Sequence, residues 1–282
     1  MQKMTSPTTA KINVQKFWDQ NPCGGDWVSF EKKITWAFNV EPYILNYLRD
    51  DLLRNKHVLE IGCGQGFLLA LLAKKSSKAV GLDLSNQSLH KARCGLTELR
   101  LQNFELVQGD AEKLPFDNQS FDTAYSIGVL HHTANTQKSI DEIYRVLKNN
   151  GTGIIMLYRK YTPKWLVVVT LRYLARLFNL VNWKQNRLID TIRKSEKYNN
   201  SNVGTAAVEL FGCPVLKMYS FGQIKKMFKS FSSVKLTSEQ PGFVRFLDFT
   251  PFGKKLLRPF CGWLDKHTKK IFGFYAVIEV KK

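Results

Sequence analysis

A strand-like run that ends in closely spaced glycines sets the framework of this 282-residue chain. The segment VLEIGCGQG, residues 58–66, begins with aliphatic residues and contains an acid and three glycines, Gly62, Gly64 and Gly66. The apolar segment FLLALLAK follows at once and is typical of a helix. Glycine permits unusual φ values and lets a ligand approach the backbone closely. A strand, a glycine loop and a helix in this order predict a nucleotide-binding turn.

The acids near this loop indicate what kind of nucleotide it binds. The dinucleotide pattern G-x-G-x-x-G requires its third glycine at the position of Phe67, one residue later than in this chain. The carboxylate of Glu60 would repel a pyrophosphate but attract an ammonium or sulfonium group. Asp83 and Asp110 end the next two apolar runs, and a carboxylate at the position of Asp83 can hold ribose hydroxyls. Three acids at successive strand ends predict a nucleoside ligand with a cationic tail.

Strand-like and helix-like segments alternate through the first half of the chain. The predicted strands are residues 56–61, 79–83, 104–108, 121–126 and 152–158. The predicted helices are residues 8–19, 41–54, 66–75, 86–99 and 136–148. Such alternation implies right-handed crossovers and an α/β fold with a doubly wound parallel sheet. Ligands bind at the carboxyl ends of the strands in such sheets. The residues at these ends are Glu60, Asp83, Asp110, Ser126 and Tyr158.

Four motifs in order resemble those of the class I S-adenosylmethionine (SAM) dependent methyltransferases. The nearest group is the small-molecule one (methyltransferase type 11), which includes the ubiquinone and menaquinone methyltransferases. The motifs are E-x-G-x-G-x-G, GLDLS, GDAEKLPF and DNQSFDTAYSIGVLHHT, and they lie within residues 56–158. The resemblance implies a seven-stranded, Rossmann-like methyltransferase sheet with an antiparallel last strand, and SAM as the cofactor. Strand-like segments at 233–239 and 272–280 would complete that sheet.

The resemblance also assigns roles to individual residues. Glu60 and the glycine loop would hold the methionine end of SAM, Asp83 the ribose, and Asp110 with Ala111 the adenine. The residues expected to bind the cofactor are therefore Glu60, Gly62, Cys63, Gly64, Gly66, Asp83, Leu84, Asp110, Ala111 and Ser126.

The segment SIGVLHHT, after the fourth predicted strand, bears on the methyl acceptor. Enzymes of this class that methylate exocyclic amines of bases usually carry Asn/Asp-Pro-Pro-aromatic there, and this sequence does not. His131 or His132 can act as a general base, or can support the loop through a backbone carbonyl. Tyr158 is the third candidate for catalysis. Oxygen, nitrogen and carbon all stay open as the accepting atom.

We divide the chain into four parts. These are an N-terminal helical cap at 1–55, a SAM-binding core at 56–158, a basic aromatic lid insertion at 159–230 and C-terminal strands at 231–282. Aromatic residues of the cap either shape the substrate site or pack the cap onto the sheet. They are Trp18, Trp27, Trp36 and Phe38.

The lid begins with an apolar stretch at residues 165–181, in which Arg172, Arg176 and Asn179 share one helix face. The stretch is shorter than the ~20 residues of a membrane span, and its two arginines oppose insertion. It predicts a helix that roofs a lipophilic pocket or lies on a membrane surface. A lid helix packed on its own domain is the plainer alternative.

Charge is divided unevenly along the chain. Residues 1–150 carry 18 Lys and Arg against 16 Asp and Glu, whereas residues 151–282 carry 24 against 7, a net charge of +17. This imbalance either keeps the surface solvated or marks an anionic partner. Five scattered cysteines without a C-x-x-C pair argue against a metal site and for a reducing compartment. The N-terminus has no apolar core of signal-peptide length.

Together these features predict a cytoplasmic SAM-dependent methyltransferase, without a metal, that acts on a small hydrophobic or lipid-like substrate. The cationic and aromatic second half predicts peripheral docking on an anionic membrane surface, such as the inner face of a membrane. Two rival functions are RNA (tRNA) methylation, because the +17 charge suits phosphates, and a non-catalytic SAM-binding scaffold. Nucleic acid is the less favoured partner.

Overall fold

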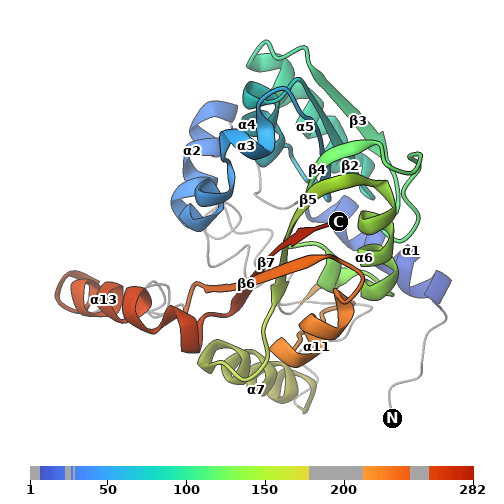
Figure 1. Ribbon diagram of the computed structural model, residues 1–282. Coiled ribbons are helices and arrows are strands. Elements are labelled where there is room, and N and C mark those ends of the chain that lie inside the picture. Colours follow the sequence, from blue (N-terminus) through green and yellow to red (C-terminus); the bar gives the residue numbers. More distant parts are fainter. Residues whose placement is uncertain (1–6, 23–26, 28, 178–211, 242–253) are drawn as a thin grey trace.

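A single mixed sheet of seven strands forms the centre of the protein (Figure 1). The computed structural model describes residues 7–22, 27, 29–177, 212–241 and 254–282, to which all structural statements refer. The strands, in the spatial order β3-β2-β1-β4-β5-β7-β6, are β1 His57–Ile61, β2 Lys78–Asp83, β3 Phe104–Gln108, β4 Phe121–Ile127, β5 Leu147–Tyr158, β6 Ser233–Glu239 and β7 Tyr275–Lys281. Strands β1 to β5 are parallel, and β7 runs antiparallel to β5 and β6. The predicted seven-stranded doubly wound sheet is therefore confirmed.

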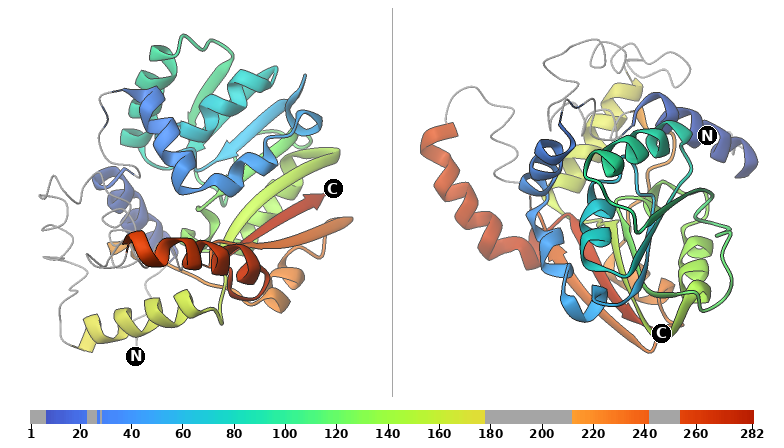
Figure 2. Two further views of the ribbon diagram at one scale, coloured as in Figure 1. Left: turned by 90° about the vertical axis from the view of Figure 1, so that its left-hand side faces the viewer. Right: turned by 90° about the horizontal axis from the view of Figure 1, so that it is seen from above.

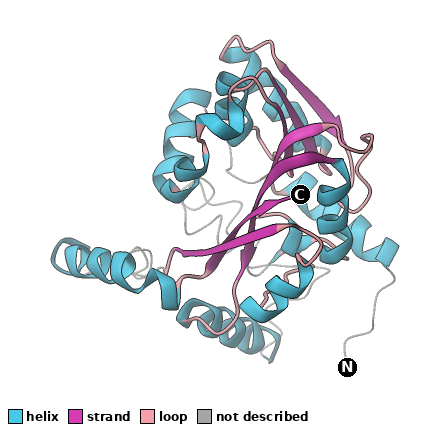
Figure 3. Cartoon of the chain, in the orientation of Figure 1, coloured by secondary structure: helices cyan, strands magenta, loops and turns pink. Residues whose placement is uncertain are grey.

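Helices cover both faces of this sheet (Figures 2 and 3). On one face lie α2 Phe30–Val40, the 3₁₀ helix η1 Pro42–Tyr47, α3 Asp50–Leu53, α4 Phe67–Lys75 and α5 Asn86–Glu98. On the other face lie α6 Thr136–Val146 and α11 Phe221–Met227. Each face encloses its own apolar core, and Tyr125 belongs to the first whereas Phe121 and Phe228 belong to the second. Four elements remain: α1 Pro7–Gln20, the 3₁₀ helix η2 Leu130–His132, α7 Pro163–Leu177 and α13 Lys254–Phe272.

Side-chain caps explain where several of these helices begin. Ser85 accepts a hydrogen bond from the backbone N–H of Ser88 at the start of α5, and Asn135 accepts one from Lys138 at the start of α6. Ser220 and Gln223 form a reciprocal capping box on α11. These caps satisfy backbone donors that the first helical turn leaves unpaired.

The single helix predicted at 41–54 is wrong. The chain there forms η1 and α3, separated by Leu48 and Arg49. The hydroxyl of Tyr125 on β4 donates a hydrogen bond to the carbonyl oxygen of Tyr47, the last residue of η1. A contact with the sheet thus occupies a backbone acceptor at the point where the helix is interrupted. The sequence pattern also missed α2 and α13, and it ended the helix of α6 two residues too late.

Helix α7 occupies the start of the predicted lid. Its expected extension to residue 181 lies outside the described residues. The polar, Asn-rich sequence of residues 184–212 predicts a connecting segment, and all of it but residue 212 also lies outside them. Helix α11 also falls within the predicted lid, but its Ile224 and the following Phe228 are buried in the core. No helix in the described part of the chain is long and apolar enough to cross a membrane.

Candidate active site

The loop between β1 and α4 has the backbone of a ligand-binding turn. Gly62, Gly64 and Gly66 have φ values of 74°, 53° and 82°, in the left-handed region that favours glycine. A side chain at Gly62 would also overlap Val129. The backbone N–H groups of Gly62 and Cys63 both donate to the carbonyl oxygen of Leu82, which ties the loop to the end of β2.

Two acids lie beside this loop. Glu60, the next-to-last residue of β1, is buried with 5% of its surface exposed, and its Oε2 atom has no hydrogen-bond partner among the described residues. Burial, together with the charge of Asp83, raises the pKa of Glu60 well above its ordinary value. Asp83 ends β2 and accepts hydrogen bonds from the N–H groups of Gly64 (2.8 Å) and Ser85 (2.9 Å). Burial raises the pKa of Asp83 as well.

Helix α1 lies over the third acid. Lys11 Nζ is 2.6 Å from Asp110 Oδ2 and 2.9 Å from Glu112 Oε2. One turn further along α1, Gln15 donates to the carbonyl oxygen of Leu84 at 3.3 Å. These contacts hold the N-terminal helix across the carboxyl ends of the strands, although nearly one hundred residues separate Lys11 from Asp110.

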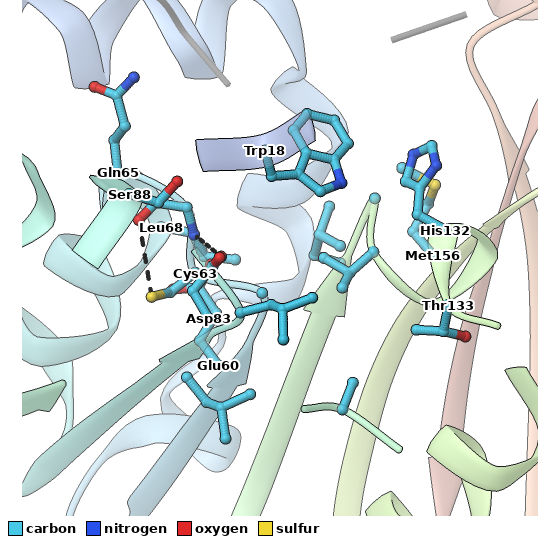
Figure 4. A pocket seen from close by; sticks show the side chains of 18 of the residues that line it. Trp18, Glu60, Cys63, Gln65, Leu68, Asp83, Ser88, His132, Thr133 and Met156 are labelled. Carbon is cyan, nitrogen blue, oxygen red and sulfur yellow. Dashed lines mark hydrogen bonds between the residues drawn. The ribbon is translucent and has the colours of Figure 1, made fainter. Parts of the chain in front are cut away.

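A cavity of about 340 Å³ extends from these acids to the end of β5 (Figure 4). Figure 4 shows Glu60 and Asp83 on one side, His132 and Met156 on the other, and Trp18 between them. The half of the cavity on the side of His132 and Met156 is mainly aromatic and aliphatic. Its lining includes Trp18, Trp36, Phe38, Val40, Ile44, Met156, Tyr158 and Tyr275.

His132 is held by a contact from the lid segment. Its Nδ1 atom lies 2.8 Å from the carbonyl oxygen of Val215, and 3.2 Å from the sulfur of Cys213. A carbonyl oxygen only accepts, so Nδ1 carries the proton of a neutral ring and Nε2 keeps its lone pair. His132 lines the cavity, and Trp18 packs edge-on against its ring at 5.4 Å.

His131 occupies a different environment from its neighbour. Its side chain is fully buried, stacks on Tyr158 with 3.9 Å between ring centroids, and does not line the cavity. Burial, followed by the proximity of His132, lowers the pKa of His131 well below its ordinary value. Tyr158 lines the cavity between His131 and Tyr275, whose ring stacks at 5.4 Å. This geometry assigns His131 to packing and leaves His132 and Tyr158 facing the cavity.

Comparison with known proteins identifies this arrangement. The family described as "Methyltransferase domain" matches residues 59–155, which include the glycine loop, Asp83, Asp110 and both histidines. The chain carries a methyltransferase domain. The expected resemblance to the class I SAM-dependent methyltransferases is thereby confirmed over these residues.

The methyltransferase domain has relatives in several organisms. The chain is 39% identical over 111 residues to the uncharacterised protein MJ1252 of Methanocaldococcus jannaschii, a match that covers 39% of this chain and 40% of the relative. It is 26% identical over 193 residues to the ubiquinone biosynthesis O-methyltransferase of Coxiella burnetii (strain CbuK_Q154), covering 68% and 81%. A possible histamine N-methyltransferase of Thermotoga maritima has the same fold, with a TM-score of 0.52, 17% identity, and coverage of 95% and 99%. The chain thus spans about two fifths of the length of MJ1252. The fold shared with the Thermotoga maritima protein, in contrast, extends over nearly the whole of the present chain.

The cofactor of this domain is SAM, and the residues present fit it. The buried, unpartnered oxygen of Glu60 requires a donor, and the ammonium group of a methionine moiety supplies one. A cation there also restores the charged forms of Glu60 and Asp83 that burial disfavours. The space beside Gly64, where an added side chain would meet no atom within 4 Å, leaves room for a ligand against the loop backbone.

The cavity brings together most residues that the sequence predicted. Those that line it are Glu60, Gly62, Cys63, Gly64, Asp83, Leu84, Asp110, Ala111, His132 and Tyr158. Gly66 is instead the N-cap residue that precedes α4, and Ser126 is buried and donates to the carbonyl oxygen of Ile61. Of the aromatic cap residues, Trp18, Trp36 and Phe38 line the cavity, whereas Trp27 donates to Gln65.

Sequence reasoning missed several residues that complete the lining. They include Lys11, Val14, Glu41, Ile44, Ser88, Gly128, Met156, Lys164 and Tyr275. The last two come from α7 and β7, and Lys164 Nζ lies 5.1 Å from the ring centre of Tyr275. The basic character of the lid was the one signal available for Lys164.

Proposed function

We propose that the protein transfers the methyl group of SAM to an ionisable oxygen of a small hydrophobic substrate. One observation carries this proposal. The aromatic and aliphatic half of the cavity is continuous with the half that contains Glu60 and Asp83, and His132 lines this common space. A relative named as an O-methyltransferase of ubiquinone biosynthesis supports an apolar acceptor of this kind.

The residues of the chain divide the work between binding, alignment and proton transfer. SAM, when bound, supplies an electrophilic methyl group on its sulfonium sulfur. Glu60 and Asp83 anchor the charged and hydroxyl-bearing parts of the cofactor, and the aromatic wall aligns the acceptor. Lys11 and Gln15 hold α1 over the cavity, which excludes water.

His132 is the candidate general base in this proposal. With its Nδ1 proton directed to Val215, its Nε2 atom accepts the proton of a weakly acidic hydroxyl as the oxygen attacks. A phenol or enol needs such a base, whereas a carboxylate acceptor does not. The bond formed is oxygen to methyl carbon, the bond broken is methyl carbon to sulfur, and the proton remains on His132 until it reaches solvent.

RNA methylation is the second candidate, and one observation favours it. Residues 151–282 carry 24 Lys and Arg against 7 Asp and Glu, a surplus that suits phosphates. The aromatic wall of the cavity would then stack an extruded base. A scaffold that binds SAM without turnover is the third.

Methyl transfer to a fractionated extract separates these functions. The chain is incubated with SAM labelled on its methyl group and with separate lipid-soluble, water-soluble small-molecule and RNA fractions. Label in the lipid-soluble fraction, absent with the His132→Ala variant, is the expected result. Label confined to RNA would overturn the proposal in favour of the second candidate. Cofactor binding without label in any fraction would point to the scaffold.

A further inference from the structure

Exposed apolar side chains are concentrated on two helices at one end of the molecule. Among the described residues, twelve large apolar side chains are exposed, and nine of them lie on α7 or α13. Those on α7 are Leu166, Val167, Val169, Tyr173 and Leu174, and those on α13 are Leu257, Phe260, Trp263 and Ile271. Figures 1 and 2 show both helices on the side of the molecule remote from β3.

Helix α13 has its apolar face directed away from the protein. Leu257, Phe260 and Trp263 follow at intervals of three residues on one face and are 46%, 59% and 55% exposed. The rings of Phe260 and Trp263 are nearly parallel, at 6.3 Å, and Trp263 stacks on His267 at 4.6 Å. The side of α13 that faces β6 is polar, because Lys269 pairs with Glu239 there. A helix that packs only against its own domain would instead turn its apolar face toward the protein and its polar face toward water.

Helix α7 repeats this arrangement. Leu166, Val169 and Tyr173 lie on one exposed face, whereas Val168 on the opposite side is 3% exposed. No acid occurs in α7, which contains one lysine and two arginines. Helix α13 contains six lysines and arginines against one aspartate, and its Lys266 and Lys270 are exposed beside Trp263. The apolar face of α13 is therefore bordered by positive charge, and α7 contributes no negative charge beside its own exposed face.

We propose that the exposed faces of α7 and α13 form a docking surface for an anionic phospholipid bilayer. Aromatic and aliphatic side chains enter the interface between headgroups and acyl chains, and the bordering lysines attract the phosphates. A free polyanion such as RNA satisfies the lysines but leaves Leu166, Leu257 and Phe260 in water. The combination of exposed apolar faces with the lysines beside Trp263 therefore favours a membrane over a nucleic acid.

This surface adjoins the acceptor half of the cavity, which is the aromatic and aliphatic half beside His132. Lys164 in the first turn of α7 and Tyr275, three residues after α13, both line the cavity. Docking would place the acceptor half next to the bilayer, where an apolar substrate is most concentrated. The docking itself requires no turnover, so it can be tested whether or not the proposed reaction is correct.

Vesicle co-sedimentation of the full chain tests the proposal. Vesicles of phosphatidylcholine alone, or mixed with phosphatidylglycerol, are spun down at low and at high salt. The wild type is expected in the pellet only with the anionic vesicles, and less of it at high salt. Phe260→Ser/Trp263→Ser should lower the vesicle partition coefficient at least tenfold. Lys266→Glu/Lys270→Glu should lower it several-fold at low salt.

Leu45→Ser is the matched control, because Leu45 is a similarly exposed leucine, at 47%, on η1 rather than on α7 or α13. Its partition should equal that of the wild type. Wild-type protein that stays in the supernatant with every vesicle overturns the proposal. So does binding that the serine double variant leaves unchanged. All variants are first compared with the wild type by circular dichroism and thermal melting, so that a loss of fold is recognised.

Two further measurements distinguish other occupants. Sedimentation equilibrium without vesicles detects a dimer, and a dimer that Phe260→Ser/Trp263→Ser converts to monomer would mean that a second copy covers this face. A mobility shift with single-stranded RNA detects nucleic acid. An RNA shift that only the lysine variant abolishes, together with no vesicle binding, would assign the charge to RNA. Either result overturns the membrane proposal.

Discussion

Nδ1 of His132 lies 2.8 Å from the carbonyl oxygen of Val215, which is 83 residues further along the chain. A residue of the predicted lid segment thus sets the tautomer of a ring in the cavity. A substitution at Val215 would leave its backbone carbonyl in place. The contact is therefore tested by substituting His132.

His132→Ala should reduce turnover by ~10²–10⁴-fold, the usual contribution of a general base. Affinity for SAM should be unchanged, because His132 lies on the acceptor side of the cavity. Single-turnover kinetics and calorimetry measure the two effects separately. Cys213→Ala is the control, since it removes the sulfur 3.2 Å from the same ring but keeps the Val215 carbonyl. Near-normal turnover of His132→Ala would leave the histidine as a loop support.

Glu60 should make the ligand-free protein less stable as pH rises. Its native pKa is raised, so above the ordinary pKa the unfolded chain loses this proton while the native state keeps it. The native state then binds more protons, and the free energy of unfolding falls with rising pH until the native pKa is passed. The loss is about 1.4 kcal/mol for each unit of pKa difference.

Glu60→Gln removes this titration. Its free energy of unfolding, relative to the wild type, should therefore increase as the pH rises above the ordinary pKa of a glutamate, about 4.3. Urea denaturation of both proteins without cofactor, at several pH values, gives this difference. The same variant should bind SAM more weakly, because an amide does not attract the ammonium group. A difference in unfolding free energy that is independent of pH would contradict the assigned burial effect.

Asp83→Asn should weaken SAM binding by ~1.5–3 kcal/mol, the value of hydrogen bonds to a charged group. This corresponds to roughly a 10–150-fold rise in Kd. Asp117→Asn, the same change at an exposed residue outside the cavity, is the matched control and should leave the Kd unchanged. Isothermal titration calorimetry measures the Kd for SAM of both variants. Equal Kd values would show that Asp83 does not belong to the cofactor site.

Lys11→Met should loosen α1 while changing SAM affinity by less than about fivefold. Its ion pairs with Asp110 and Glu112 are partly exposed, and such pairs contribute ~0.2–1 kcal/mol. Hydrogen exchange of the α1 amides should become faster in the variant. Lys16→Met, on the same helix but exposed, should leave exchange unchanged. Equal protection of α1 in both variants would show that other contacts hold the helix.

The core of the fold and the cofactor half of the cavity follow from local sequence patterns. Alternating strands and helices, with Glu60 and Asp83 at strand ends, specify a parallel sheet whose loops meet at one edge. Neighbouring positions in such a sheet are related by regular geometry. Spacing along the chain was therefore sufficient to predict that the glycine loop and three acids meet, without knowledge of the packing.

The acceptor half was decided by tertiary structure alone. His131 and His132 are adjacent and chemically identical, yet packing against Tyr158 buries one, while the other lines the cavity and contacts Val215. Lys164 joins the cavity from the first turn of α7, just before the stretch whose pattern predicts a roof over a pocket, a helix on a membrane surface or a packed lid. The outward direction of Trp263 was equally unreadable, since a periodic pattern reveals an apolar face but not the side to which it turns. These outcomes depend on contacts between distant segments, and no local pattern encodes which segments meet.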